Sequence, residues 1–280
     1  MKTLAWGAET LGWFNSATAE QLALALQSNA ITGLALDRGC LDGQGLPEAI
    51  FSFPRFDALV LTEPNRTDLS QLPRLPHLRL LSVGEGSRSP VDLTRLPELE
   101  DLSVCPQSAD TLPLAESPLR RLVLRKYRPA SKSLADLPSY TALHELELIQ
   151  CRVQSLAGLN RMVQLRSLGL FNCAELEGAD PAFIPKSLTS IHLDSCKRFT
   201  DLEALASLDQ LVKIVLANMP PLRSLSFLRS FDRLEEFRFV KTDVEDGDLK
   251  PLLQLKRVGF LDRKKFNLTL SEVNKQISLS

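Results

Sequence analysis

Hydrophobic residues recur along most of this chain in one short pattern, apolar-x-x-apolar-x-apolar. Between Ile31 and Phe260 the pattern occurs eleven times, at intervals of 20 to 25 residues. The copies begin at Ile31, Phe56, Leu78, Leu99, Leu119, Leu143, Leu165, Leu188, Leu211, Leu234 and Leu255. A fixed period of this length predicts a solenoid, in which each repeat buries its apolar side against its neighbours.

Each copy predicts one short β-strand. In one copy, Leu146 and Leu148 are two residues apart, so they lie on the same side of a strand. The alternating residues Glu145, Glu147 and Ile149 lie on the opposite side. Ten steps of about 4.8 Å give a parallel inner sheet on the order of 50 Å along its curve. The apolar, proline-interrupted segments between strands predict 3₁₀ turns and single helical turns on the convex side.

The repeated pattern resembles that of the leucine-rich-repeat family, over roughly four fifths of the chain. Residues 68–72 and 92–96 are similar to the short repeats of bacterial internalins, and residues 196–201 resemble the cysteine-containing subtype. The asparagine ladder usual in the family is absent here. The resemblance implies an α/β leucine-rich-repeat solenoid, with a curved parallel β-sheet on the concave face, 3₁₀ turns and short helices on the convex face, and helical caps at both ends.

The unbroken repeat predicts a single domain, 1–280. Its parts are an N-terminal cap over 1–30, eleven repeats over 31–260 and a C-terminal cap over 261–280. Thr18 and Gln21 are spaced as a capping box that opens a helix over 19–28. Thr269 and Glu272 have the same spacing and predict a second short helix. Such caps hide the terminal core of a solenoid.

Composition and charge restrict the kind of partner. The chain has 280 residues, of which 44% are hydrophobic and 24% charged, and its formal net charge is −1. This balance gives no overall attraction to nucleic acid or to an anionic membrane. No apolar run approaches the length of a membrane span, and the first residues lack the apolar stretch of a secretory signal. We expect a cytoplasmic protein without a nucleic-acid or membrane partner.

The five cysteines favour the same location. Cys151, Cys173 and Cys196 occupy one repeat position, 22 and 23 residues apart, which predicts a buried ladder of S–H groups that act as weak donors. A disulfide or a metal site is the alternative at these positions. Free thiols fit a reducing compartment. We expect no metal and no cofactor.

Candidate catalytic groups are few. His192 and Asp194 point to the same face by the two-residue period, so an acid–base or metal pair is one hypothesis. A solvated pair on an open sheet is the favoured interpretation. The sequence contains no glycine-rich phosphate loop and no nucleophile elbow. We therefore expect that the protein is not an enzyme.

The concave face offers a candidate binding surface. Ile149 and Phe171 are adjacent apolar residues on that face, and charged residues surround them. An apolar centre with a charged rim is typical of a protein-binding site. The full predicted set is Arg125, Tyr127, Glu145, Glu147, Ile149, Phe171, His192, Asp194, Arg238 and Lys241.

The sequence therefore predicts a non-catalytic protein-binding module that acts through its concave face. The expected partner is another protein, with the size of a small globular domain, and the chain on its own is expected to be a monomer. Residues 243–260 resemble the last repeat of certain bacterial cytoplasmic leucine-rich-repeat proteins, some of which are immunity proteins. That resemblance implies a bacterial immunity protein that neutralises a toxin. The alternative is a regulatory adaptor or scaffold that docks an enzyme or signalling protein.

Overall fold

The computed structural model describes residues 2–6, 9–27, 31–37, 40, 45–53, 56–62, 68–85, 92–106, 108–200 and 202–279. The chain splits into two compact units. The first comprises Met1–Tyr127 and Pro138–Leu143, and the second comprises Arg128–Leu137 and His144–Ser280. Each unit carries its own part of the repeat, and each is described below by itself.

The first unit contains an antiparallel hairpin followed by parallel strands. Its strands are β1 (Lys2–Trp6), β2 (Glu9–Phe14), β3 (Gly33–Leu36), β4 (Ala58–Leu61), β5 (Leu80–Val83), β6 (Asp101–Val104) and β7 (Arg121–Arg125). Its helices and 3₁₀ turns are α1 (Ala19–Gln27), α2 (Glu48–Phe51), η2 (Leu72–Arg74) and η3 (Ala109–Thr111). The strands follow one another in sequence order, as a solenoid requires.

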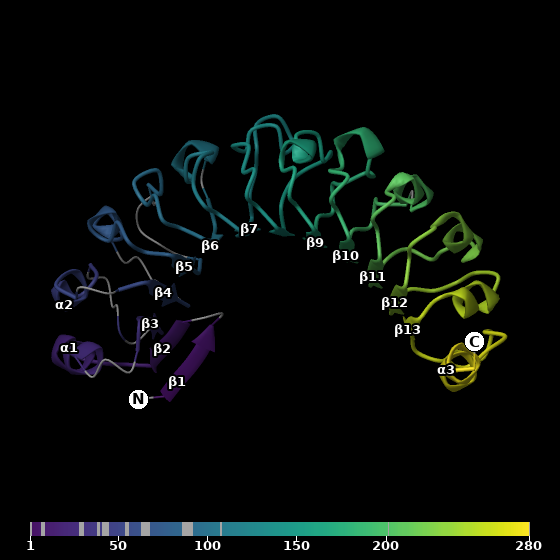
Figure 1. Ribbon diagram of the computed structural model, residues 1–280, viewed down its shortest axis with the longest axis horizontal. Helices are drawn as coiled ribbons and strands as arrows, with labels where there is room; N and C mark the ends of the chain where they lie inside the picture. Colours follow the sequence, from purple (N-terminus) through teal and green to yellow (C-terminus); the bar gives the residue numbers. More distant parts are fainter. Residues whose placement is uncertain are drawn as a thin grey trace. The chain divides into compact units, whose positions relative to one another are not determined.

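The second unit continues the same plan with parallel strands only. These are β8 (Glu145–Ile149), β9 (Ser167–Phe171), β10 (Ser190–Asp194), β11 (Lys213–Ala217), β12 (Glu236–Val240) and β13 (Arg257–Gly259). The segments between them form η4 (Leu159–Arg161), η5 (Pro181–Phe183), η6 (Glu203–Ser207), η7 (Ser226–Ser230) and η8 (Lys250–Gln254), and the chain ends with α3 (Leu270–Ile277). Figure 1 shows that, within each unit, the turns and helices lie on one side of the strands.

The predicted leucine-rich-repeat solenoid is confirmed. The eleven predicted copies supply the strands β3 to β13, one strand per copy. In β9, Leu168 and Leu170 are completely buried on the side covered by the turns, whereas Ser167 and Phe171 are partly exposed on the other side. The predicted 3₁₀ turns are also present, because return segments of this length are too short for full helices.

The chain turns sharply at the ends of β8 to β11 in the second unit. Gln150, Asn172, Ser195 and Asn218 follow β8 to β11 and have φ between 51° and 57°, which is the left-handed region. Their backbone N–H groups donate to the strand-end carbonyl of the next repeat, as from Gln150 to Phe171 at 2.8 Å. The turn also reverses the alternation of the strand, so the residue after it points into the core.

The predicted cysteine ladder occupies this inward position. Cys151, Cys173 and Cys196 are buried free thiols. The Cys173 thiol donates to the Leu148 carbonyl of the previous strand at 3.5 Å, and the Cys196 thiol donates to the equivalent carbonyl of Leu170 at 3.4 Å. Contact with the Cys151 thiol and burial raise the pKa of Cys173 to about 12. The ladder replaces the missing asparagines with weaker donors.

Both predicted capping boxes are present. Thr18 Oγ1 accepts from the Gln21 backbone at 3.3 Å, and Thr18 N–H donates to the Gln21 side chain at 3.0 Å. The pair Thr269 and Glu272 makes the same reciprocal bonds before α3, which buries Val273. Residues 28–30 lie outside the described residues. The N-terminal hairpin was not predicted, so the first cap is more than a helix. The single domain 1–280 stays a prediction.

Candidate protein-binding face

The open face of a unit is defined here as the side of its sheet that the turns do not cover. In the first unit this face is not accessible over β3, β4 and β5. Every residue of these three strands is buried, whichever side of the sheet its side chain faces. The open-face side chains form one apolar cluster, against which Trp13 packs: Leu11, Ala35, Ala58, Val60 and Leu80. The backbone is also close here, since a Cβ on Gly33 would lie 2.1 Å from the Ala58 carbonyl oxygen.

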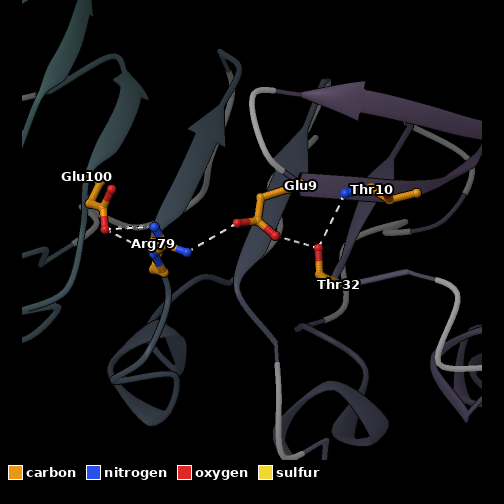
Figure 2. Close-up of polar contacts among 5 residues, drawn as sticks. All are labelled: Glu9, Thr10, Thr32, Arg79 and Glu100. Carbon is orange, nitrogen blue, oxygen red and sulfur yellow. Dashed lines mark hydrogen bonds and ion pairs between the residues drawn. The ribbon is translucent and has the colours of Figure 1, made fainter.

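Polar contacts fasten the hairpin to this closed region (Figure 2). Glu9 on β2 accepts a hydrogen bond from the Thr32 hydroxyl and pairs with Arg79, which precedes β5, at 3.5 Å. Arg79 pairs in turn with Glu100 at 2.9 Å. The Glu9 side chain is only 11% exposed. Its carboxylate would destabilise the fold if it had no partner, and the contacts with Thr32 and Arg79 offset that cost. The hairpin is therefore held to residues far along the chain.

The prediction for Tyr127 is wrong. Its side chain is 2% exposed and cannot contact a partner. Lys126 has φ of 53°, so the chain turns after β7 and directs the next residue into the core. Tyr127 occupies the repeat position of Cys151, and that equivalence is a signal that could have placed it correctly. Arg125, also predicted for the surface, is partly exposed and donates to the hydroxyl of Ser103.

The second unit, in contrast, has an accessible open face. Side chains that alternate with the buried leucines of β8, β9, β10 and β11 are almost all partly or fully exposed, apart from Gly169. Strand pairing in register aligns them in three rows. The third row contains Ile149, Phe171, Asp194, Ala217 and Val240. This unit holds most of the predicted binding residues.

Phe171 is the aromatic centre of this face. A Cβ built on Gly169 would lie 2.6 Å from a ring carbon of Phe171, so the ring fills the space that a side chain at 169 would occupy. On the neighbouring strand, the His192 ring meets it edge-on at 4.8 Å between centroids. Register also places Ile149 and Phe171 side by side. Gly169 was not predicted, although a lone glycine inside a strand often marks such a close approach.

His192 and Asp194 serve this surface in different ways. Burial lowers the pKa of His192, and the opposing effect of Asp194 does not overcome it. The imidazole is therefore neutral at pH 7. Asp194 accepts hydrogen bonds from Ser195 and Asn218, both at 2.8 Å. Within the described ranges, no group of three His, Cys, Asp or Glu side chains could hold a metal ion.

A cationic cluster occupies the other end of the same face. We define it as Lys213, Arg238 and Arg257 around the carboxylate of Glu236, which is 4% exposed. The three cations contact Glu236 at 3.1, 2.8 and 2.9 Å. Burial alone would raise the pKa of Glu236, but the cations lower it below its ordinary value. Glu236 was not predicted for the site, because the sequence does not show that its side chain is buried.

Eight of the ten predicted site residues lie in the second unit, where they form two groups. Glu145, Glu147, Ile149, Phe171, His192 and Asp194 lie on β8, β9 and β10. Arg238 lies on β12 and Lys241 directly follows that strand, both of them exposed. β11 separates the two groups. The described part of the chain contains no helix long and apolar enough to cross a membrane.

Comparison with known proteins identifies the repeat. Residues 115–255, just over half of the chain, match the family described as the endo-beta-N-acetylglucosaminidase EndoS LRR domain. No curated protein matches the sequence. Among solved structures, an internalin (inlF) of Listeria monocytogenes has a TM-score of 0.50 and 16% identity, over 90% of this chain and 88% of that chain.

A leucine-rich-repeat protein of Leptospira interrogans is similar to the same extent. Its TM-score is 0.51 at 17% identity, and the similarity covers 95% of this chain and 79% of that chain. At this level of identity the structures show the fold alone. The family match and the repeat geometry agree, and the chain belongs to the leucine-rich-repeat family represented by the EndoS leucine-rich-repeat domain.

Proposed function

We propose that this chain is a non-catalytic protein-binding module whose partner docks on the open face of the second unit. The observation that carries the proposal is the aromatic centre, where Phe171 lies over Gly169 and against His192. A partly exposed ring that is already held in one orientation loses little conformational freedom on binding. Large aromatic side chains of this kind dominate the energetics of many protein interfaces.

The surroundings of Phe171 support the same function. Ile149 extends the apolar centre on one side, while Glu145, Glu147 and Asp194 supply charge around it. An apolar centre inside a charged rim lets charge guide the approach of a partner and lets apolar burial hold it. The first unit offers no equivalent surface over β3 to β5, because its face there is buried.

The test is a kinetic binding series with a purified partner, captured first from native lysate on the immobilised wild-type chain. Phe171→Ala and Ile149→Ala should each speed dissociation by roughly tenfold or more, since a central anchor typically contributes about 2 kcal/mol. Glu147→Ala should mainly change the salt dependence of the association rate, because rim charges act on the encounter.

Val163→Ala is the matched control. Val163 is also an exposed apolar residue, at 59%, but it follows η4 among the turns that cover the other face. Arg161 would be a poor control, because its guanidinium donates to the carbonyl oxygens of Leu134, Ala135 and Leu137. If Val163→Ala abolished binding and Phe171→Ala did not change it, the proposed face would be rejected.

Gly169→Ala tests the orientation of the ring without removing it. The new methyl group would meet Phe171 at 2.6 Å and the Glu147 side chain at 3.2 Å, so the ring must move. Because the ring is the end of a side chain that can rotate, we expect unfolding free energy to change by less than about 1 kcal/mol. Partner dissociation should nevertheless accelerate. Unchanged kinetics would mean that the ring position does not matter for binding.

We propose, more narrowly, that the partner is a toxin which this chain neutralises as an immunity protein. The support is the resemblance of residues 243–260 to the last repeat of certain bacterial leucine-rich-repeat proteins, some of them immunity proteins. The alternative is a regulatory adaptor. Co-expression with the product of the adjacent gene distinguishes them: an immunity protein restores growth that the product alone inhibits. An adaptor binds its partner without any effect on growth.

We also propose a reducing, cytoplasmic location. All five cysteines are free, and three of them are buried thiols within hydrogen-bond reach of backbone carbonyls. Thiols persist in this state where the surroundings keep them reduced. Mass spectrometry of protein from cells lysed directly into denaturant that contains an alkylating reagent would test this location. Five alkylated cysteines after denaturation are expected, and an intramolecular disulfide would reject it.

A further inference from the structure

We infer that the cationic cluster over β11–β13 binds an extended acidic segment of the partner protein. The inference rests on the proposed function and specifies the chemistry of what docks at this end of the open face. Its basis is a cluster in which three cations share a single buried carboxylate. With Lys213, Arg238 and Arg257 positive and Glu236 negative, the charge is 3 − 1 = +2.

The backbone positions these charges together. Register pairs Lys213 with Glu236 on the neighbouring strand, and Glu236 with Arg257 on the next. Arg238 is paired with Gly259, and a Cβ there would lie 3.2 Å from the Arg238 side chain. The missing side chain at 259 leaves room for the Arg238 stem. The arrangement therefore depends on three neighbouring strands and on one glycine.

The two arginines retain hydrogen-bonding capacity toward a ligand. Each makes its shortest contact with Glu236 through Nε, at 2.8 Å for Arg238 and 2.9 Å for Arg257. A guanidinium has five N–H donors, and its Nη groups suit carboxylate acceptors. The side chains are 51% and 59% exposed. Glu236 thus contacts both guanidinium groups through Nε, and more than half of each arginine side chain remains exposed.

Apolar residues flank the cluster and favour a peptide over a free anion. Val240 is 41% exposed at the end of β12, and Leu261 is 59% exposed just past β13. The residues before them, Phe239 and Phe260, stack at 5.2 Å in the core, so their strands are neighbours at this point. A segment that alternates carboxylates with apolar side chains would satisfy both the cations and this flank.

The aromatic residues of β12 and β13 argue against a nucleic-acid strand. Phe237, Phe239 and Phe260 are all buried, and no described residue on the open face of β11–β13 is aromatic. Single-stranded nucleic acid is held largely by stacking of bases on exposed aromatic rings. A nucleic-acid strand would be held here by ionic contacts only, whereas a protein segment would also bury apolar side chains against Val240 and Leu261.

The experiment uses the full chain and a labelled ten-residue peptide with four glutamates and two leucines in a serine background. Binding is followed by fluorescence anisotropy at low salt and at 0.15 M salt. We expect saturable binding that weakens at least tenfold when the glutamates are replaced by glutamines. Arg238→Gln and Arg257→Gln should each weaken binding of the acidic peptide about tenfold, and Arg238→Lys should restore part of it.

Arg229→Gln is the matched control, since Arg229 is an exposed arginine at the end of η7, on the covered side of the sheet. It should leave peptide binding unchanged. Circular dichroism and urea titration of every variant show whether weaker peptide binding reflects a lost contact or an unfolded protein. Arg257 is the more exposed of the two arginines, so we expect Arg257→Gln to fold normally. Equal binding of the acidic and neutral peptides would overturn the inference, as would equal effects of Arg229→Gln and Arg257→Gln.

A second probe covers the competing class of ligand. A twelve-nucleotide single strand that bound more tightly than the acidic peptide, through the same arginines, would overturn the inference in favour of nucleic acid. The proposed function has a separate readout in the Phe171→Ala dissociation rate. If the acidic peptide did not bind but Phe171→Ala still accelerated dissociation of the partner, the acidic-segment inference would be rejected. The proposed function would stand.

Discussion

Leu168 and Phe171 lie three residues apart on β9, and they face opposite sides of the sheet. Leu168 is completely buried among the repeat leucines, whereas Phe171 is partly exposed and rests on Gly169. Both are large apolar side chains, so composition does not distinguish them. Their orientation follows from the two-residue period of a strand, and it places Leu168 in the core and Phe171 on the open face.

Leu168→Ala should lower the free energy of unfolding by about 2–5 kcal/mol, because it leaves a cavity that the stacked repeats cannot fill. Phe171→Ala should lower it by much less, since the ring is partly in solvent already. Urea titrations of the two variants provide the comparison. Equal losses would mean that the Phe171 ring belongs to the core, and the site would lose its aromatic centre.

Glu236 predicts a pH dependence of stability. Its pKa in the folded protein lies below the ordinary value because three cations face it. The folded state therefore binds its proton less readily than the unfolded state does. The stabilisation is fully present above the ordinary pKa of about 4.3, and it is lost as pH falls through the lower native value.

Glu236→Gln removes that contribution. The difference in unfolding free energy between wild type and Glu236→Gln should be constant between pH 7 and about pH 5 and should shrink on further acidification. Urea titrations across this range measure it, and comparison with the variant cancels the effect of other carboxylates. A difference that stays constant down to pH 3 would show that the cations do not stabilise the Glu236 carboxylate.

At the scale of one repeat, the strand and the turn after it follow different rules. The period-two rule correctly predicts the alternating residues of β8, but it ends at Gln150, whose left-handed conformation directs Cys151 inward. Tyr127 was misplaced for this reason. The buried carboxylate of Glu236 could not be predicted either, because its burial depends on long side chains from two neighbouring strands, and pattern alone does not place those.

The ladder of thiols gives a prediction for this level of structure. Cys151, Cys173 and Cys196 should resist N-ethylmaleimide in the native protein, because burial blocks access and the pKa of Cys173 is raised to about 12. They should react fully in denaturant. Cys40 and Cys105, which are partly exposed, serve as internal references. Fast native labelling of the three ladder cysteines, measured by mass spectrometry, would contradict the ladder.

For the molecule as a whole, the repeat pattern predicted the solenoid and eleven of its twelve parallel strands, β3 to β13. It did not predict the β1–β2 hairpin, which pairs with β3 and supplies Leu11 and Trp13 to the apolar packing of the first unit. The hairpin stands outside the repeat, and its fastening by Glu9 and Arg79 joins residues 70 positions apart. Contacts at such a separation leave no periodic trace in the sequence.

The single domain 1–280 is open to a direct test. Both tryptophans, Trp6 and Trp13, lie in the first unit, so tryptophan fluorescence follows that unit, while far-UV circular dichroism follows all strands. If neighbouring repeats couple along the whole chain, urea unfolding should give the same midpoint by both methods. Separate midpoints would show that the two units unfold independently.

The left-handed turns lower the stability of the protein, because several of them are occupied by residues that this conformation disfavours. Lys126, Gln150 and Lys241 adopt a left-handed conformation, which costs a residue other than glycine, asparagine or aspartate about 1–2 kcal/mol. Gln150→Gly or Gln150→Asn should therefore raise the melting temperature, with each change worth roughly 1 kcal/mol. Substitutions at these turn positions can therefore raise the free energy of unfolding without changing the core leucines or the open-face side chains.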